Sequence, residues 1–497
     1  MTGRLTLFKS PDLLCKQWEL DAAGVPIKTA AAQLWRGDYR VQEFSSAADL
    51  AAILNDVTTR QAVSASLPLD GSVTGVITTA ANEGRDGAKS RSKRNFGLQP
   101  GPGLLFIDHD APSAEGGMTR EDLWAKLCEF IPALRQCGVV WRPSGSSHIF
   151  HIFHGEKDLT SLRGQHLFVL LQDASDGPRV LKYLEARSWL DGLGTVKVSA
   201  AGSLLLRCPI DTAVRDPARL IFSGGAECAP PLEQRRGPPI VLSEGGFLDS
   251  RRDVPELTAE QQGRYQALVE SAKTAAMVEA LPKRAEHRSK VIAKRLPELM
   301  KQGATAGEAE ARIGQMVDAM YSGLLLADAE LTLVHDNGQH EVVTVDQVLS
   351  QRDRYHETKV LDPLNPGHRG GAADGMLFLR GTSPIVYSFD DGGQVYRLRA
   401  ARRRVVVQKG SRSEVVTALA DVVADLDRAF ITDAGMVLVQ DGRRIALSPE
   451  RLMNLVGLEV QLVTIGAKGA ELPTDLPMET AKLVLTELVT RGARHAA

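Results

Sequence analysis

An apolar run that ends in two acidic residues is the feature that most constrains how this chain folds. Residues 103–112 read GLLFIDHDAP, so the apolar stretch Leu104–Ile107 runs directly into Asp108, His109 and Asp110. A short unbroken apolar run is typical of a strand that is buried on both faces. Successive side chains of a strand point to opposite faces, so Asp108 and Asp110 share one face, about 7 Å apart, and His109 lies on the other.

Two carboxylates on one face repel each other unless a cation lies between them. The pattern is therefore compatible with a pair of divalent ions of the kind that serve phosphoryl or nucleotidyl transfer. The alternative is a strand end followed by a solvated acidic turn. Taken alone, the motif favours that alternative.

The first half of the chain shows the alternating pattern of a mixed α/β structure. Stretches rich in β-forming residues alternate with helical stretches whose apolar residues recur at i, i+3 and i+4. The predicted strands span 73–80, 103–110, 137–143, 148–154 and 166–173, and the predicted helices span 119–136 and 178–193.

The length of 497 residues predicts two to four domains. A proline- and charge-rich stretch around residues 228–260 predicts a linker or a wrapped arm after the α/β region. A strongly helical stretch follows, in which Pro282 and Gly303 suggest about three helices, and then strands and a mixed region that resembles a winged helix. We expect domains at 1–235, 258–328, 329–410 and 411–497, with the linker at 236–257.

Composition is ordinary for a globular chain, with 43% hydrophobic and 24% charged residues and a net charge of −2. The sequence contains no apolar stretch long enough to span a membrane and no signal-peptide pattern, so we expect a cytoplasmic protein. The five cysteines are scattered without a CxxC pair, which argues against structural zinc and against a disulfide framework.

With this net charge, nucleic-acid binding would need local basic patches. Two clusters are candidates, at 283–295 and 397–412, and each could equally be a solvated surface. Their candidate DNA-binding residues are Lys283, Arg284, Arg288, Arg402, Arg403 and Arg404.

A second motif, RPSGSSH, spans residues 142–148. A Ser/Gly-rich turn that leads into a strand can present backbone N–H groups to an anion. His148 could donate to a phosphate, and Arg142 is either a phosphate contact or a surface charge. His148, His151 and His154 do not predict a three-histidine metal site, because strand alternation puts His151 on the opposite face.

A third apolar run, within residues 203–225, ends in Asp211 and is followed by Arg215 and Arg219. One further carboxylate would complete a three-acid metal site with Asp108 and Asp110. On its own, Asp211 is better explained as a helix N-cap or turn residue.

The three elements in this order resemble the signature motifs of the archaeo-eukaryotic primase superfamily, in particular the primase-polymerases of phages, plasmids and integrated elements. The flanking stretches KSRSKRNFG and IDTAV…PARLIF…GG look similar to the same group, and the resemblance covers roughly residues 60–235. It implies an RRM-like α+β catalytic domain, followed by the helical module and a small β-rich, winged-helix-like region.

The resemblance also implies roles for individual residues. Asp108, Asp110 and Asp211 would hold two Mg²⁺ or Mn²⁺ ions, and a single-stranded DNA template and NTP or dNTP substrates would be the partners. The residues implied in nucleotide binding are Ser144, Gly145, Ser146, Ser147, His148 and Arg219, with Arg91 and Lys93 along the nucleotide or template groove.

The second half resembles the region between primase and motor in mobile-element primase-helicase proteins, around SFDDGG at 388–393. Asp390 and Asp391 replace the Ala-His of that pattern. No GxxxxGK[ST] phosphate loop occurs, so the chain has no recognisable ATP motor, and whether a replicative helicase acts in trans is left open.

Two alternatives to a DNA primase-polymerase stay open. A non-catalytic replication-initiation protein would keep the fold without needing all three acids. An endonuclease or rolling-circle initiator would need a His-x-His pair and a nucleophilic tyrosine, but HIFH has another spacing, and Tyr183 is the only tyrosine between Tyr39 and Tyr265.

Overall fold

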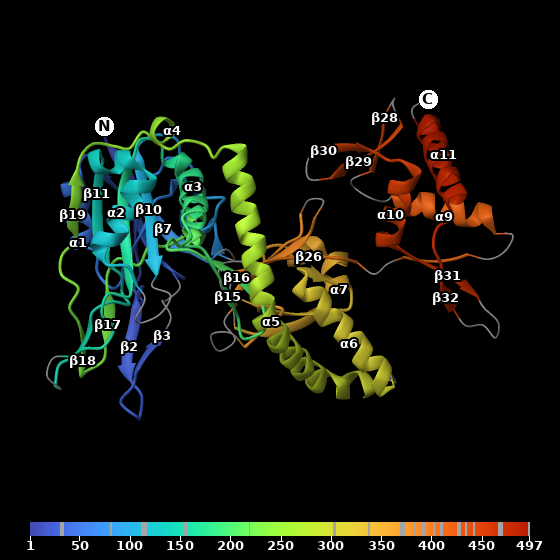
Figure 1. Cartoon of the computed structure of the whole chain (residues 1–497), viewed down its shortest axis with the longest axis horizontal. Coiled ribbons are helices and arrows are strands. Elements are labelled where there is room, and N and C mark those ends of the chain that lie inside the picture. The colour runs from blue at the N-terminus through green and yellow to red at the C-terminus, as the bar shows by residue number, and fades with distance from the viewer. Residues whose placement is uncertain are drawn as a thin grey trace. The chain divides into compact units, whose positions relative to one another are not determined.

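The computed structural model of the chain is a mixed α/β structure with two compact units, Met1–Ser289 and Lys290–Ala497 (Figure 1). Each unit has hydrophobic core clusters of its own. The structure describes residues 1–29, 34–79, 82–110, 117–153, 157–217, 219–301, 305–335, 338–367, 373–380, 383–389, 394–400, 403–407, 411–424, 429–432, 435–440, 443–465 and 471–495.

The first unit is built around a four-stranded antiparallel sheet in the order β10-β14-β11-β19. Its strands are β10 (Gly103–Asp110), β11 (Gly138–Pro143), β14 (Gly164–Leu171) and β19 (Ile240–Glu244). β10 and β14 pair along their full length, with Asp108 opposite His166. All of β14 is buried, which explains its almost unbroken apolar sequence: the sheet is covered on both faces.

Two helices cover one face of this sheet, α2 (Arg120–Phe130) and α3 (Gly177–Leu190). Leu123 and Leu127 of α2 and Leu184 of α3 pack in one core with Ile107 of β10. The side chain of Thr119 caps α2 by accepting the Asp122 N–H, and α3 has a proline in its first turn, where the missing N–H costs nothing.

The opposite face packs against a second sheet and helix α1 (Ala47–Asn55). This sheet has the order β5-β1-β4-β7-β8. Its strands are β1 (Gly3–Lys9), β4 (Gly37–Phe44), β5 (Gln61–Ser64), β7 (Thr74–Thr78) and β8 (Lys89–Ser90). Leu5 and Leu50 meet Phe106 and Phe168 in a shared core, so β10 lies between two hydrophobic layers.

Short strands bring the N-terminal segment to the turn that follows β11. They form sheets in the orders β17-β2-β3, β13-β12-β18 and β6-β9. Their bounds are β2 (Lys16–Leu20), β3 (Pro26–Thr29), β6 (Leu67–Pro68), β9 (Phe96–Gly97), β12 (Ile149–His151), β13 (Lys157–Asp158), β17 (Ala226–Cys228) and β18 (Leu232–Gln234). The indole Nε1–H of Trp18 on β2 donates to the Gly145 carbonyl at 3.1 Å.

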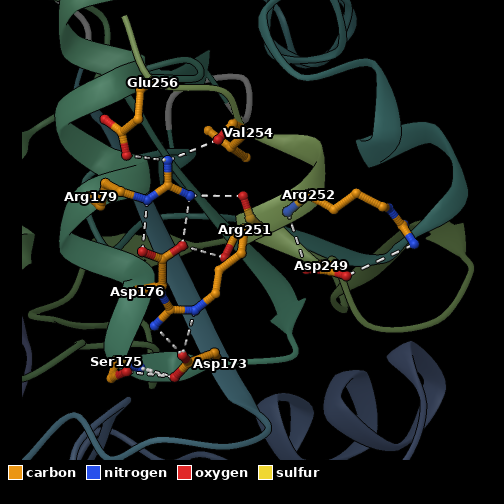
Figure 2. A network of polar contacts seen from close by, with 10 residues as sticks. Asp173, Ser175, Asp176, Arg179, Asp249, Arg251, Arg252, Val254 and Glu256 are labelled. Carbon is orange, nitrogen blue, oxygen red and sulfur yellow. Dashed lines mark hydrogen bonds and ion pairs between the residues drawn. The ribbon is translucent and has the colours of Figure 1, made fainter.

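Residues 236–257, which the composition suggested as a linker, are part of the first unit. They supply β19 to the central sheet and helix α4 (Ser250–Asp253), and Leu248 and Val254 are buried in the core beside α2 and α3. A polar network fastens α4 to the start of α3, because Ser250 donates its hydroxyl to Asp176 and accepts from Arg179 through its carbonyl (Figure 2). Arg179 also pairs with Asp176 and Glu256. The proline- and charge-rich composition therefore marks an arm that wraps the domain.

A long helix, α5 (Ala259–Lys301), follows and passes through Pro282 without ending, in contrast to the expected break. It packs on the hairpin of β15 (Thr195–Val198) and β16 (Leu204–Arg207). The Arg284 Nε–H donates to the Gly202 carbonyl at 2.8 Å, and Lys283 reaches the Val198 carbonyl.

The second unit begins with a seven-stranded sheet in the order β20-β26-β25-β24-β23-β21-β22, with helices α6, α7 and α8. The bounds are α6 (Ala306–Tyr321), β20 (Leu324–Leu325), β21 (Glu330–Val334), β22 (His340–Thr344), α7 (Val345–Ser350), α8 (Arg352–Tyr355), β23 (Lys359–Val360), β24 (Gly375–Phe378), β25 (Ile385–Ser388) and β26 (Gln394–Leu398).

A C-terminal module completes the second unit, with sheets β27-β31-β32 and β28-β29-β30 and a core formed largely by three helices. Its elements are β27 (Arg403–Val406), α9 (Arg412–Ala424), β28 (Ala429–Thr432), β29 (Gly435–Gln440), β30 (Arg443–Ala446), α10 (Pro449–Glu459), β31 (Val460–Ile465), β32 (Glu471–Pro473) and α11 (Met478–His495). Within the described ranges, no helix has the length and apolar character that crossing a membrane requires.

Candidate active site

The end of β10 carries the two carboxylates on one face, as the strand alternation predicts. Asp108 is partly buried and Asp110 is exposed, whereas His109 between them is only 2% exposed on the other face. The His109 Nδ1 lies 2.6 Å from the Pro209 carbonyl oxygen, so the imidazole ties β10 to the segment that leads into Asp211.

Asp211 lies directly beside Asp108. Its backbone N–H donates to the Asp108 carbonyl oxygen at 2.8 Å, and its carboxylate accepts from the Ala213 N–H as the N-cap of η5 (Thr212–Arg215). Asp211 is thus a cap, as its local sequence suggests, and also the third acid at this strand end. Burial, together with the charges of Asp110 and Asp211, raises the pKa of Asp108 to about 8.

Asp110 meets the serine-rich turn at Gly164, the residue opposite it on β14. A Cβ built on Gly164 would lie 3.0 Å from the Asp110 Oδ1 and would collide with the Ser144 hydroxyl. The Ser144 N–H donates to the Gly164 carbonyl at 2.8 Å. The first and second sequence motifs are therefore in contact, and only glycine leaves room between them.

The turn Ser144–Ser147 is held rigidly by residues around it. The Ser147 hydroxyl is fully buried, donates to the Gly164 carbonyl and accepts from the Arg163 and Gly164 N–H groups, so it holds the turn together. The Gln234 amide donates to the Ser144 and Ser147 carbonyls. The Ser146 hydroxyl is 2.6 Å from the Nζ of Lys16 on β2.

His148 follows the turn in a left-handed backbone conformation, with φ of 56°. Its Nδ1 is 2.9 Å from an Asp158 carboxylate oxygen. The other oxygen of Asp158 accepts from the Thr160 and Ser161 N–H groups, so Asp158 is itself anchored to the backbone. This pairing fixes the orientation of the imidazole and turns Nε2 away from Asp158.

Three basic residues expected around the nucleotide gather near Asp211. Arg219 Nη2 is 3.7 Å from the Asp211 carboxylate, and Lys93 forms a 2.9 Å ion pair with Asp216. Burial lowers the pKa of the Arg91 guanidinium, an effect that neighbouring Asp216 opposes and Arg219 reinforces. Segments around residues 91 and 219 thus form one cationic flank beside the third acid.

The other predicted DNA contacts of the first unit are buried or lie outside the candidate site. Arg142 is only 5% exposed and donates to the Leu54 carbonyl at the end of α1, so it cannot contact a DNA strand in this structure. Lys283 and Arg284 hold the β15–β16 hairpin on α5, and Arg288 lies on the same helix.

The second basic cluster is only partly described. Arg402, Asp390 and Asp391 lie outside the described residues. Arg403 and Arg404 begin β27 and pair with β31, but their side chains are also outside what the structure describes.

Several residues of the candidate site belong to none of the three sequence motifs. His166, opposite Asp108, has its Nε2 3.7 Å from the Asp108 Oδ1. Burial, together with the charges of Lys16, Arg236 and Arg142, lowers the pKa of His166 to about 3. Five further residues of the site come from separate parts of the chain: Lys16, Asp158, Gly164, Gln234 and Arg236. The sequence indicated only the position of Gly164, through the apolar run of β14 that pairs with β10.

The donor chemistry of the three acids suits a hard divalent cation. None of the described residues forms a hydrogen bond with the buried Asp108 Oδ1, and a cation would offset the repulsion among the three carboxylates. In the described part of the chain, however, no three or more His, Cys, Asp or Glu side chains form a group that could hold a metal ion as placed. The acids converge, but they do not make a complete ligand set in this structure.

Comparisons with known proteins give no relative for this chain. No family model matches it, and neither the curated proteins nor the solved structures contain a match.

Proposed function

We propose that the first unit is a metal-dependent DNA primase-polymerase, which transfers a nucleotide from an NTP or dNTP to a 3′-hydroxyl on a single-stranded DNA template. The observation that carries this proposal is the meeting of Asp211 with Asp108 and Asp110, beside the Ser144–Ser147 turn. Three acids from distant segments, next to a rigid serine turn and a cationic flank, are groups of the kind that nucleotidyl transfer uses, and this supports the proposal.

The arrangement of elements supports an RRM-like catalytic sheet. Apart from the short strands, the chain runs β10-α2-β11-β14-α3-β19, a β-α-β-β-α-β succession with both helices on one face. One departure is that β19 lies beside β11, at the edge opposite β10, whereas the last strand of an RRM lies beside the first.

In this proposal Asp108, Asp110 and Asp211 would hold Mg²⁺ or Mn²⁺, which would activate the 3′-hydroxyl and offset charge on the phosphates. The turn, kept rigid by Ser147 and Gln234, would offer the Gly145 N–H to the triphosphate, because the Ser144, Ser146 and Ser147 N–H groups donate within the protein. His148, oriented by Asp158, would donate to a phosphate oxygen. The Arg91, Lys93 and Arg219 flank would contact triphosphate or template.

Primer extension on single-stranded DNA with labelled dNTPs or NTPs and Mg²⁺ or Mn²⁺ tests this proposal. We expect extension by the wild type and a loss of at least about a thousandfold for Asp108→Asn or Asp110→Asn, roughly 4 kcal/mol of transition-state stabilisation. The matched control is Asp191→Asn, which removes a carboxylate that pairs with Lys126 outside the site.

An Asp110→Asn protein that extends primers at the wild-type rate would contradict the proposal. Cleavage of the template without extension would favour the endonuclease alternative. Binding of DNA with neither reaction would favour a non-catalytic initiation protein.

A further inference from the structure

Lys16 is a cationic side chain in the candidate site that none of the three motifs contains. It begins β2, and strand pairing places it opposite Ala226 of β17. Two hydrogen bonds fasten this strand to the serine turn, from Trp18 to the Gly145 carbonyl and from Lys16 to the Ser146 hydroxyl at 2.6 Å. The position of Lys16 against the turn is therefore set by the fold of the strand.

The ammonium of Lys16 also lies near the acids. Its charge lowers the pKa of Asp108 and that of His166, so both groups are within its electrostatic reach. Among the described residues, however, no carboxylate oxygen lies within 4.0 Å of the Lys16 Nζ. A half-buried lysine with three N–H donors thus has one neutral partner, the Ser146 hydroxyl.

The surroundings of Lys16 add positive charge rather than neutralise it. Arg142 and Arg236 lie close to each other near His166, and burial lowers their pKa values to about 10 and about 9. Arg142 Nε and Arg236 Nη1 are buried and without hydrogen-bond partners in the described structure, although each guanidinium donates to one backbone carbonyl. Buried cations without carboxylate partners are costly, and an anion bound nearby would offset that cost.

We propose that Lys16 binds a phosphate group of the nucleoside triphosphate at the Ser144–Ser147 turn, with Arg142 and Arg236 strengthening the positive potential from behind. This inference rests on the proposed function and names an additional substrate-binding residue for it. A lysine ammonium is a point charge on a flexible stem, which suits a phosphate whose position shifts between binding and reaction.

The test uses the full chain and two probes, inorganic tripolyphosphate and dATP, with binding measured by calorimetry with and without Mn²⁺. Lys16→Met keeps the length of the side chain but removes its charge, and Lys16→Arg keeps the charge. The control is Lys9→Met, which removes an exposed lysine from β1. Primer extension and thermal unfolding are measured on the same proteins.

We expect Lys16→Met to weaken tripolyphosphate and dATP binding by about tenfold or more, Lys16→Arg by less than about threefold, and Lys9→Met to leave binding unchanged. The KM for dNTP should rise in Lys16→Met. Equal affinities of wild type and Lys16→Met for both probes would overturn the inference.

Equal losses in Lys16→Met and Lys16→Arg, with equally lowered unfolding temperatures, would also overturn it, since Lys16 would then only support the turn. Failure of the proposed function has a different signature. A wild-type chain that binds tripolyphosphate through Lys16 but never extends a primer would refute nucleotidyl transfer and support the phosphate contact.

Discussion

A buried aspartate lies at each end of the β10–β14 strand pair, and the two aspartates differ in their hydrogen bonding. Near the start of β10, Asp176 receives the Nε–H and an Nη2–H of Arg179, each at 2.8 Å, and the Ser250 hydroxyl at 2.6 Å (Figure 2). At the far end, the buried Asp108 Oδ1 accepts no hydrogen bond from any residue in the described ranges, and the Nε2 of His166 on β14 is 3.7 Å away.

The pKa values follow this difference. Hydrogen bonds from Arg179 lower the pKa of Asp176, whereas burial and like charges raise that of Asp108 to about 8. The paired end holds α4 against α3 and stabilises the fold. At the other end, three acidic groups lie close together, and a bound cation would reduce the repulsion among them. Unrelieved repulsion of this kind is common at functional sites.

The largest effect on stability is expected for Asp176→Ala. It leaves Arg179 without its bidentate partner at a position only 6% exposed, so the free energy of unfolding should fall by about 3 kcal/mol. Because pairing lowers the pKa of Asp176, its stabilisation is present above the ordinary carboxyl pKa and lost as pH falls through the lowered value.

Urea unfolding followed on the transition of the first unit measures this change. Glu256→Ala is the control, because Glu256 binds the same Arg179 at 3.3 Å but its side chain is 80% exposed, and a change below about 0.5 kcal/mol is expected. Equal effects of the two substitutions would remove the contrast between the ends of the sheet.

An intermediate effect is expected for Gly164→Ala at the site end. The new methyl group would collide with the Ser144 hydroxyl and crowd Asp110, so we expect a destabilisation of about 2 kcal/mol together with a loss of nucleotide incorporation. Gly246→Ala is the control, because a Cβ there meets nothing within 4 Å. Chemical unfolding and primer extension measure the two effects, and an active, unaltered Gly164→Ala protein would mean that the two motifs are not in contact.

The smallest effect has the opposite sign. Asp108→Asn removes a buried carboxylate that two neighbouring acids repel, so the metal-free protein should gain about 1 kcal/mol of stability while losing activity. Asp110→Asn, at an exposed position, should change stability much less. Thermal unfolding in EDTA measures both, and a destabilised Asp108→Asn protein would show that the site end is as well paired as the Asp176 end.

Local sequence patterns predicted much of the site because strand geometry is local. An apolar run that ends in Asp-His-Asp has one outcome in a strand: Asp108 and Asp110 share a face, and His109 lies on the other. The pattern around Asp211 allowed a cap or a third acid, and the structure shows that the residue caps η5 and lies beside Asp108. The two interpretations of the position of Asp211, a cap and a third acid, are therefore compatible.

Exposure and long-range contacts were not predictable in the same way. A charged residue such as Arg142 is expected at the surface. The strand register instead places it beside His166 and under the end of α1. The proline-rich composition of residues 236–257 allowed a linker or a wrapped arm, and β19, which completes the central sheet, shows that the segment is an arm. Composition indicates whether a segment favours contact with water, but it does not indicate which other segments pack against it.

The amino-acid sequence by itself determined where the buried strands run, which side chains alternate across them and which segments carry acids, serines and arginines, because these depend on spacing along a few residues. Only the tertiary structure decided that Asp211 meets Asp108, that Gly164 separates Asp110 from Ser144 and that Lys16 reaches the turn. Those contacts join residues far apart in the chain, and pairing between distant strands is set by the packing of the whole core rather than by any local pattern.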